Sequence, residues 1–302
     1  TSSLVGSEMC IRDSSMMASD TGRAAVRAQA LSMNPQVAAQ AADARARAVD
    51  QATVSLMRTG AYADTADARA AAIAAEVEAE YGIVFAKTEV TLNGEKAPGN
   101  RTEETNLGDL ITDALVWKAT ETGETVDAAI TNGGGIRATI EAGDITKKDI
   151  NTVLPFGNTL SIIKITGSEL LEVLEASTFC TPEAIGGFPQ VSGIEFTVDT
   201  SKAYDAGDEY PGTTYAAPKS INRVTITSVG GKDFDPAATY TIATNDFMAS
   251  GGDTYYRFIN ATANYDLGIA MDEVVMDYVK TVLGGTITAD KYGQPAGRIT
   301  VS

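Results

Sequence analysis

The 302-residue sequence contains no histidine, only two cysteines and a single tryptophan. Without histidine, this polypeptide cannot supply a Ser-His or Cys-His nucleophilic pair, nor a zinc or two-metal site that uses imidazole ligands. The cysteines, Cys10 and Cys180, do not have metal-ligand spacing and say little about the redox compartment. No run of about 18 apolar residues occurs, so no membrane span is predicted.

Positive charge is also scarce, with 23 Lys and Arg against 40 Asp and Glu, for a formal net charge of −17. This balance argues against nucleic-acid polymers and anionic membranes as general partners. A site for an anionic small molecule must therefore be a local positive pocket, while most of the acidity is expected on the solvated surface. The 44% hydrophobic content is enough for a sizeable core in one large or two ordinary domains.

The N-terminal part of the chain divides into two stretches of unusual composition. Residues 1–15, beginning TSSLVGSEMCIRDS, have neither helix nor strand periodicity, and no basic start with an apolar core that would form a signal peptide. They resemble the translated sequencing adaptor at the ends of some environmental (metagenomic) reading frames, so we expect a non-native tail on a fragment whose gene extends upstream. Residues 16–86 are Ala-rich and predict a helical connector, or alternatively a partly frayed segment.

Residues 87–302 alternate strand and helix signals with hairpin turns, which predicts an α+β domain with mixed sheets and packed helices. Asn106 is expected to cap a helix whose core-facing stripe repeats at helical spacing: Leu107, Leu110, Ile111, Ala114 and Leu115. Further helices are predicted at 146–153, 167–178 and 270–283. Strands are predicted at 159–166, 191–198, 221–229, 239–244 and 298–301.

One turn stands out, because the strand-like run 126–131 leads into Asn132, three glycines at 133–135, Ile136 and Arg137. Glycines permit positive φ and close approach of a ligand to the backbone. Successive exposed amides in such a turn form an anion-binding concavity, and a guanidinium suits bidentate contact with phosphate. The turn therefore indicates a phosphate or nucleotide site, or else a tight turn whose arginine faces water.

Four stretches carry a resemblance to a known family when they are taken in order. They are Arg101-Thr102-Glu103-Glu104-Thr105-Asn106-Leu107-Gly108, Asn132-Gly133-Gly134-Gly135-Ile136-Arg137, Leu154-Pro155-Phe156-Gly157-Asn158, and the run from Ala243 through Asn245, Phe247 and Gly251-Gly252 to Asp253. Over roughly 87–302 the chain resembles the C-terminal, substrate-binding domain of the 5′-nucleotidase and UDP-sugar hydrolase family. Any one stretch is a weak signal, whereas four in order are a strong one.

The resemblance implies a set of substrate-binding residues. Arg101 and Arg137 match arginines on the phosphate side, with Asn132 as a nearby donor. Phe156 and Phe247 match the aromatic pair that sandwiches the base, which tolerates different bases. Asp253 matches the carboxylate that accepts hydrogen bonds from the ribose hydroxyls, and Gly133, Gly134, Gly135, Gly251 and Gly252 are expected to allow close backbone approach.

Each of these residues also has a simpler interpretation. A phenylalanine in a turn usually fills a core, an aspartate after two glycines usually makes a local turn bond, and Arg101 alone reads as a surface charge. Asn245 and Asp246 are expected to cap the following turn or helix rather than to act in catalysis.

The resemblance covers only half of such an enzyme. In the family, hydrolysis is performed by a separate N-terminal metallophosphoesterase domain that holds two divalent metals through Asp, Asn and His. The sequence lacks histidine and has no room for that domain before residue 87, so we expect no metal and no catalytic residue in this chain.

The resemblance therefore implies the nucleotide-recognition part of a periplasmic or extracellular phosphohydrolase. The expected partners are a nucleotide or nucleoside and the metallophosphoesterase domain. The alternatives are a related phosphoesterase (a cyclic-nucleotide phosphodiesterase, a UDP-sugar hydrolase or a SoxB-like enzyme) or a stand-alone nucleotide-binding module.

Overall fold

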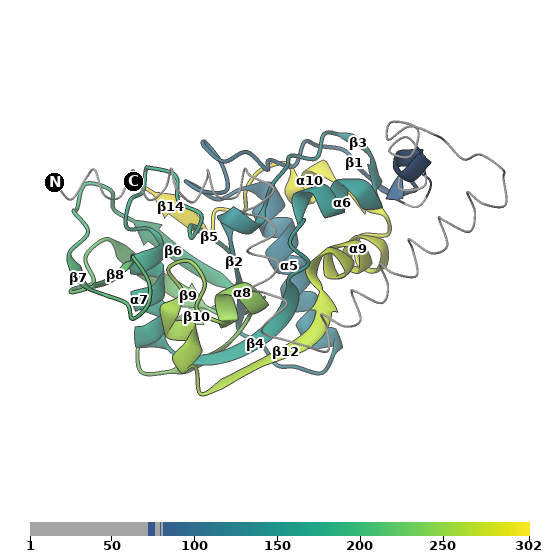
Figure 1. Cartoon of the computed structure of the whole chain (residues 1–302). Coiled ribbons are helices and arrows are strands. Elements are labelled where there is room, and N and C mark those ends of the chain that lie inside the picture. Colours follow the sequence, from purple (N-terminus) through teal and green to yellow (C-terminus); the bar gives the residue numbers. More distant parts are fainter. Residues whose placement is uncertain (1–71, 76–78, 80) are drawn as a thin grey trace. The chain divides into compact units, whose positions relative to one another are not determined.

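The computed structural model describes residues 72–75, 79 and 81–302, and divides the chain into two units, Thr1–Ile83 and Val84–Ser302. The predicted tail at 1–15 lies outside the described residues, as does most of the predicted connector at 16–86. Of that connector, residues 72–75, 79 and 81 are described as helical, and residues 84–86 belong to the strand β1 (Val84–Thr88). The second unit carries all the named elements (Figure 1).

A five-stranded mixed sheet forms the centre of the second unit. Its strand order is β12 (Ala263–Ala270), β4 (Thr159–Thr166), β11 (Thr239–Asn245), β2 (Ala128–Asn132) and β5 (Pro189–Ser192). Strand β4 pairs antiparallel with both β11 and β12, whereas β2 runs parallel to β11 and antiparallel to β5. The mixed pairing confirms the predicted α+β class.

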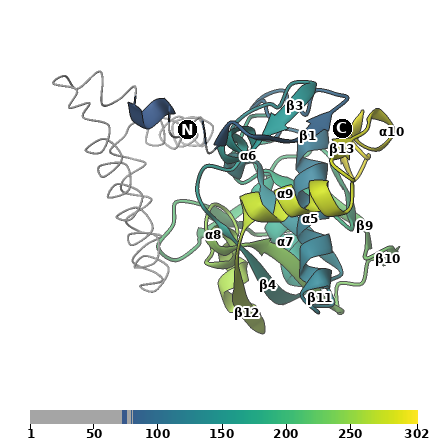
Figure 2. The same ribbon diagram turned by 90° about the vertical axis from the view of Figure 1, so that its right-hand side faces the viewer.

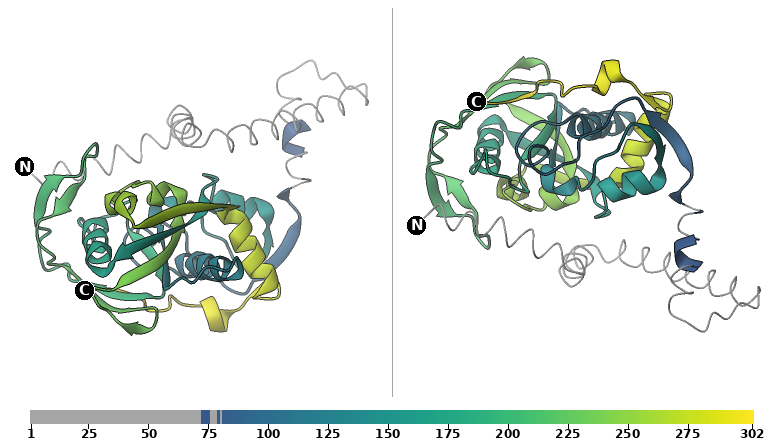
Figure 3. Two further views of the ribbon diagram at one scale, coloured as in Figure 1. Left: turned by 90° about the horizontal axis from the view of Figure 1, so that it is seen from below. Right: turned by 90° about the horizontal axis from the view of Figure 1, so that it is seen from above.

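The side chains on the two faces of this sheet belong to two separate hydrophobic clusters, because successive strand residues point to opposite sides. On β4, Leu160 and Ile162 join the cluster that contains helices α5 (Asn106–Glu121) and α9 (Met271–Thr281). Ile163 and Ile165 join the cluster that contains α7 (Gly167–Ser177). Figures 1 and 3 show α7 and α9 on opposite sides of the sheet, and Figure 2 shows α9 crossing α5.

Helix α5 has the predicted apolar stripe, and all its members are buried: Leu107, Leu110, Ile111, Ala114 and Leu115. The predicted cap at Asn106 is wrong, because the side chain of Thr105 accepts the Gly108 N–H as N-cap and Asn106 is the first helical residue. Asn106 instead ties separate segments together, since its Nδ2 donates to the carbonyls of Thr91 and Tyr292.

Two further helices begin with reciprocal capping boxes, which fix their start points. Thr146 and Asp149 cap α6 (Lys147–Val153), and Thr166 and Glu169 cap α7. In each pair the hydroxyl accepts the N3 amide while the carboxylate accepts the cap amide, so two otherwise unpaired donors are satisfied. Strand β4 therefore passes into α7 without a loop, as predicted.

The predicted single strand at 191–198 is wrong, because Gly193 divides it. Residues on its two sides form β5 and β6 (Ile194–Val198), which belong to different sheets. Gly193 has φ 75°, and a Cβ there would lie 2.6 Å from the Asp127 carbonyl oxygen. A left-handed residue in a crowded position is restricted to glycine, so the chain turns here from one sheet into the next.

Strand β6 belongs to a four-stranded sheet of order β10 (Lys232–Asp233), β9 (Val224–Val229), β6 and β14 (Ile299–Val301). A hairpin at Gly230-Gly231 joins β9 to β10, with φ 61° and 72° at the two glycines. Two smaller sheets have the orders β13-β1-β3 and β7-β8, with β1 (Val84–Thr88), β3 (Gly143–Thr146), β7 (Ala206–Glu209), β8 (Ala216–Pro218) and β13 (Thr286–Ile287).

The remaining short elements are α8 (Asp246–Ala249), α10 (Ala289–Tyr292), and the 3₁₀ turns η1 (Gly133–Gly135) and η2 (Tyr256–Asn260). Within the described residues, no helix combines the length and apolar character needed to cross a membrane.

Candidate functional site

The glycine turn after β2 is a short 3₁₀ helix, and this overturns two expectations. None of its glycines has positive φ. The amides of Gly133 and Gly134 donate to the carbonyls of Phe188 and Gly186, at 2.7 Å each. Because these N–H groups are used by the protein's own backbone, they do not form the predicted anion-binding concavity.

The glycines are needed instead for close packing. A Cβ at position 133 would lie 1.8 Å from the Asn100 carbonyl oxygen, which leaves no room for any side chain. A Cβ at 134 or 135 would come within 3.3 or 3.2 Å of the Asn132 amide group. The turn therefore brings Asn132 close to the backbone and places Arg137 just beyond it.

Three cationic side chains share the neighbourhood of this turn. Arg101 and Arg137 both lower the pKa of Lys96, with the charge of Arg101 as the largest cause, then burial, then the charge of Arg137. Arg101 is only 7% exposed, and its Nε has no hydrogen-bond partner among the described residues. A buried guanidinium N–H without an acceptor is costly, so this group is suited to an anion.

Lys96 was missed by sequence reasoning. It precedes Arg101 by five positions in a turn-rich stretch, and its only signal was a basic residue in an acidic chain. The structure thus adds a third cation to the two arginines predicted for the phosphate side. Arg137 itself donates through Nη1 to the Gly134 carbonyl at 3.3 Å and lies 5.8 Å from the centroid of the Phe156 ring.

Asn132 and Asp253, which are distant in sequence, meet in the structure. The Asn132 Nδ2 donates to Asp253 Oδ2 at 2.9 Å. Asp253 has φ 52°, a left-handed conformation that aspartate tolerates better than most residues. The predicted phosphate-side amide and the predicted ribose carboxylate are therefore hydrogen-bonded neighbours.

Phe247 lies at the start of α8 and is 38% exposed, so it does not fill a core. Its ring lies against Gly252, where a Cβ would sit 2.5 Å from Cζ. We expected Gly252 to leave space for a ligand, but the Phe247 ring occupies that space. Gly251 has φ 85°, so it is a conformational requirement of the turn.

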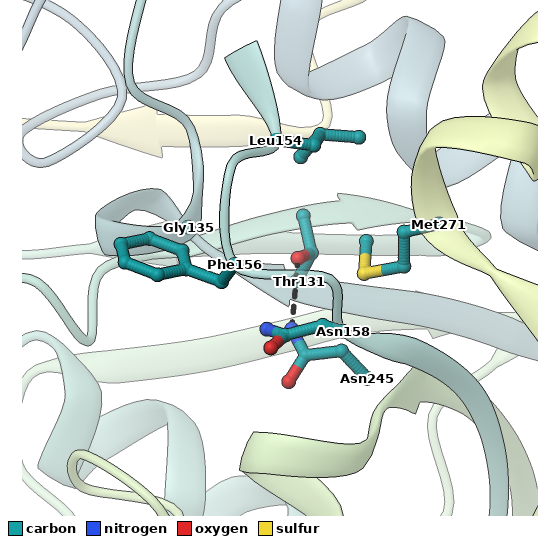
Figure 4. A pocket seen from close by; sticks show the side chains of 7 residues that line it. All are labelled: Thr131, Gly135, Leu154, Phe156, Asn158, Asn245 and Met271. Carbon is teal, nitrogen blue, oxygen red and sulfur yellow. Dashed lines mark hydrogen bonds between the residues drawn. The ribbon is translucent and has the colours of Figure 1, made fainter. Parts of the chain in front are cut away.

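Phe156 is half-buried and lines a small pocket with about 230 Å³ of empty space, including the part open to solvent. The other lining residues are Thr131, Gly135, Leu154, Asn158, Asn245 and Met271. Figure 4 shows the amides of Asn158 and Asn245 beside Thr131, with the Phe156 ring extending to the other side of its loop. Asn158 and Asn245 were not predicted as site residues.

Asn245 has the capping role expected from the sequence, whereas Asp246 is the first residue of α8 and its carboxylate contacts β4. The Asn245 side chain accepts the Met248 N–H at 2.8 Å as N-cap of α8. Asp246 Oδ1 accepts the Thr159 N–H, and burial raises the pKa of this carboxyl.

The predicted site residues fall into two groups, each held together by its own contacts. Arg101 and Arg137 lie near each other with Phe156 beside Arg137, while Asn132, Asp253, Gly252 and Phe247 form a connected chain of contacts. Among the described residues, the ring contacts found do not join Phe156 to Phe247. In the same part of the chain, no group of three or more Cys, Asp or Glu side chains is arranged to hold a metal ion.

Comparison with known proteins identifies the family of this chain. The family described as "5′-nucleotidase, C-terminal domain" matches residues 83–260, which is more than half of the chain. The chain therefore belongs to the 5′-nucleotidase C-terminal-domain family, as the sequence motifs predicted.

Similar proteins include the trifunctional nucleotide phosphoesterase protein YfkN of Bacillus subtilis, 37% identical over 68% of this chain and 13% of that protein. The 5′-nucleotidase of Vibrio cholerae is 33% identical over 66% of this chain and 31% of its own length. The crystal structure of a 5′-nucleotidase precursor from Thermus thermophilus matches with a TM-score of 0.62 and 33% identity, over 76% of this chain and 42% of that one. The chain thus spans less than half of each of these relatives.

Proposed function

We propose that this chain is the nucleotide-recognition domain of a 5′-nucleotidase-type phosphohydrolase, which converts a nucleoside 5′-phosphate to nucleoside and phosphate in the complete enzyme. The observation that carries the proposal is the buried Arg101 guanidinium, whose Nε lacks a partner within the described part of the chain and which has two cationic neighbours, Lys96 and Arg137. In a chain with net charge −17, such a cluster is a local concentration of positive charge of the kind that an anionic small molecule requires.

The phosphate end of the substrate is assigned to this cluster. A phosphate oxygen would supply the acceptor that Arg101 Nε lacks, and charge-assisted bonds of this kind are among the strongest hydrogen bonds in proteins. Bringing a dianion to the cluster would also relieve the repulsion that lowers the Lys96 pKa.

The sugar and the base are assigned to the other group. Asp253, held through Oδ2 by Asn132, would accept hydrogen bonds from the ribose hydroxyls. Phe247 offers a partly exposed ring beside that carboxylate, and Phe156 offers a second ring beside Arg137. Stacking on an aromatic ring contributes about 1–3 kcal/mol per base and tolerates different bases.

A retained aromatic pair favours a nucleotide over a sulfur compound, since a thiosulfonate has no base to stack. A SoxB-like activity is therefore the less favoured alternative. A cyclic-nucleotide phosphodiesterase or a UDP-sugar hydrolase would use the same base and ribose contacts and stays an alternative, as does a stand-alone nucleotide-binding module. We also propose a periplasmic or extracellular location, which rests on the family resemblance alone.

Hydrolysis is not assigned to this chain. The sequence has no histidine, and the described residues offer no cluster suited to a metal. We therefore propose that the 302-residue chain binds nucleotides weakly and hydrolyses none, and that the family's two divalent metals belong to a metallophosphoesterase partner domain. Malachite-green measurement of phosphate release from AMP with Mn²⁺ or Zn²⁺ tests this; turnover well above a heat-denatured control would contradict it.

Binding is tested by calorimetric titration of adenosine and AMP into the full chain and two variants. Phe247→Ala and Asp253→Ala should each weaken adenosine binding by about tenfold or more, through loss of stacking and of charge-assisted hydrogen bonds. Tyr265→Ala removes another exposed aromatic ring, on β12, and Asp233→Ala removes an exposed carboxylate. Both controls should bind like the parent. If the two site variants also bind like the parent, the site assignment is wrong.

A further inference from the structure

Asn245 lies where β11 ends and α8 begins, and it is buried, with 1% exposure. A buried amide must satisfy both its oxygen and its NH₂ group. The Asn245 Oδ1 accepts the Met248 N–H at 2.8 Å, which is an ordinary N-cap. Its Nδ2 instead donates hydrogen bonds to side chains on the neighbouring strand, β2.

The Nδ2 of Asn245 donates to Asn132 Oδ1 at 3.1 Å and to Thr131 Oγ1 at 3.2 Å. Figure 4 shows Asn245 alongside Thr131 in the pocket wall. The Asn132 Nδ2 then donates to Asp253 Oδ2 at 2.9 Å. Three side chains from three separate segments thus form one relay of hydrogen bonds.

The direction of this relay is fixed at both ends. A backbone N–H can only donate, so Asn245 must turn its oxygen toward Met248 and its NH₂ toward Asn132. An ionised carboxylate can only accept, so Asn132 must turn its NH₂ toward Asp253 and its oxygen toward Asn245. Each amide therefore has one orientation that satisfies its neighbours on both sides.

We propose that Asn245 is a positioning residue, which sets the Asn132 amide so that Asp253 is held for recognition of ribose hydroxyls. The inference rests on the proposed function, because it gives Asp253 the ribose. It goes further in assigning selectivity for the sugar to a buried residue that does not contact it. The same amide caps α8, and α8 carries Phe247, so one side chain anchors both the base ring and the sugar carboxylate.

Asn245→Asp reverses the relay with almost no change in shape. An aspartate caps a helix as well as an asparagine does, so the bond from Met248 remains. The second carboxylate oxygen would face Asn132 Oδ1, and two acceptors repel each other. If the Asn132 amide turned over to donate to it, the repulsion would move to Asp253. No orientation of Asn132 then satisfies both neighbours.

The experiment compares the affinity of the full chain for adenosine with its affinity for 2′,3′-dideoxyadenosine. The parent should prefer adenosine by about tenfold, which is the contribution expected of hydrogen bonds to a carboxylate. In Asn245→Asp this preference should fall to about one, while binding of dideoxyadenosine should change little because stacking is retained. Asn222→Asp, at an exposed position, introduces the same charge and should keep the preference.

Asn245→Ser provides a second arm. Serine also caps helices but does not reach Asn132, so the preference should fall part of the way without an added charge. A third measurement uses the parent alone: the Asn245 side-chain amide NMR signal should shift with adenosine and stay in place with dideoxyadenosine.

The outcomes separate the two hypotheses. If the parent binds neither nucleoside, the proposed base and ribose site is wrong, and if it binds both equally, the ribose role of Asp253 is wrong. If the parent discriminates and both Asn245 variants discriminate equally well, the positioning role alone is overturned. If Asn245→Asp does not fold, the inference is tested by the Asn245→Ser variant and by the Asn245 amide signal of the parent. An amide signal that does not shift when adenosine is added overturns the inference.

Discussion

Two polar clusters in the second unit, each with buried charged side chains at its centre, contrast in how their charges are matched. In the first, Arg298 donates to Asp113 Oδ1 and to the Val191 carbonyl, at 2.8 Å each, and lies 3.3 Å from Asp109 Oδ1. In the same cluster, Glu104 accepts the amides of Gly297 and Ile299. This cluster fastens β14 to the start of α5.

The second cluster is the one around Arg101, where cations are gathered beside one another and the Arg101 Nε has no acceptor from any described residue. A buried charge that faces opposite charges is compensated within the fold, whereas buried Arg101, which has exposed Lys96 and half-buried Arg137 as cationic neighbours, leaves a demand for a counter-charge from outside. The comparison separates a structural charge cluster from a binding one on physical grounds. The predictions below test that separation, beginning with the largest effect.

Arg298→Met should destabilise the protein by about 3 kcal/mol, because removing the arginine leaves the buried Asp109 and the partly buried Asp113 without their cation. Chemical denaturation monitored by circular dichroism measures the change. Lys202→Met is the matched control, since Lys202 pairs with Asp199 at the surface and is half exposed; it should change stability by less than about 0.5 kcal/mol. Equal effects of the two substitutions would remove the distinction between the clusters.

Arg101→Met should have the opposite pattern. Replacing a buried, partly unsatisfied guanidinium by an apolar side chain should leave the free energy of unfolding within about 1 kcal/mol of the parent. The preference for AMP over adenosine should fall about tenfold, through loss of charge-assisted bonds to phosphate. Calorimetric titration of both ligands measures it, with Lys202→Met again as control. A large loss of stability with unchanged preference would make Arg101 structural.

Gly252→Ala should weaken adenosine binding by about three- to tenfold with little change in stability. The added methyl group would collide with the tip of the Phe247 ring, and this exposed ring can swing aside at low cost. Gly207→Ala, a glycine on β7, is the control. If the affinity for adenosine is unaltered, the position of the Phe247 ring does not matter for binding.

The effect expected of Asp109 is on the pH dependence of stability. Burial raises the pKa of Asp109 to about 7, opposed by the charge of Arg298. Between about pH 4, near the ordinary aspartate pKa, and pH 7 the folded state therefore binds more protons than the unfolded state, so stability should fall as pH rises. The pKa of about 7 already includes the opposing charge of Arg298, so the loss of stability over this pH range should be on the order of a few kcal/mol. Asp109→Asn should flatten the dependence of the free energy of unfolding on pH, measured by denaturation at a series of pH values. A steeper dependence in this variant would contradict the raised pKa of Asp109.

Local patterns predicted the elements whose signals are complete within a short window. The α5 stripe repeats at helical spacing, and β4 ends at a capping box, so both could be placed from sequence. The division at Gly193 could not, since nothing in the run 191–198 says which sheet each half joins. Strand β12 was not predicted, because it is an edge strand with four exposed positions and no buried one, so its sequence lacks a core-facing pattern.

The site shows the same limit. The identities of Arg101, Asn132 and Asp253 could be proposed from ordered motifs, but the contacts between them depend on distant pairings of strands. The glycine run was assigned to positive φ and to free amides, whereas the structure uses those amides for Phe188 and Gly186. Lys96 and the relay through Asn245 have no local signature, because each becomes meaningful only beside residues far along the chain.

The break at Gly193 has a mechanical consequence. Since a single residue separates β5 from β6, no linker is long enough for one sheet to come apart while the other persists. Melting of residues 84–302 should therefore be one all-or-none event, with calorimetric and van't Hoff enthalpies in agreement.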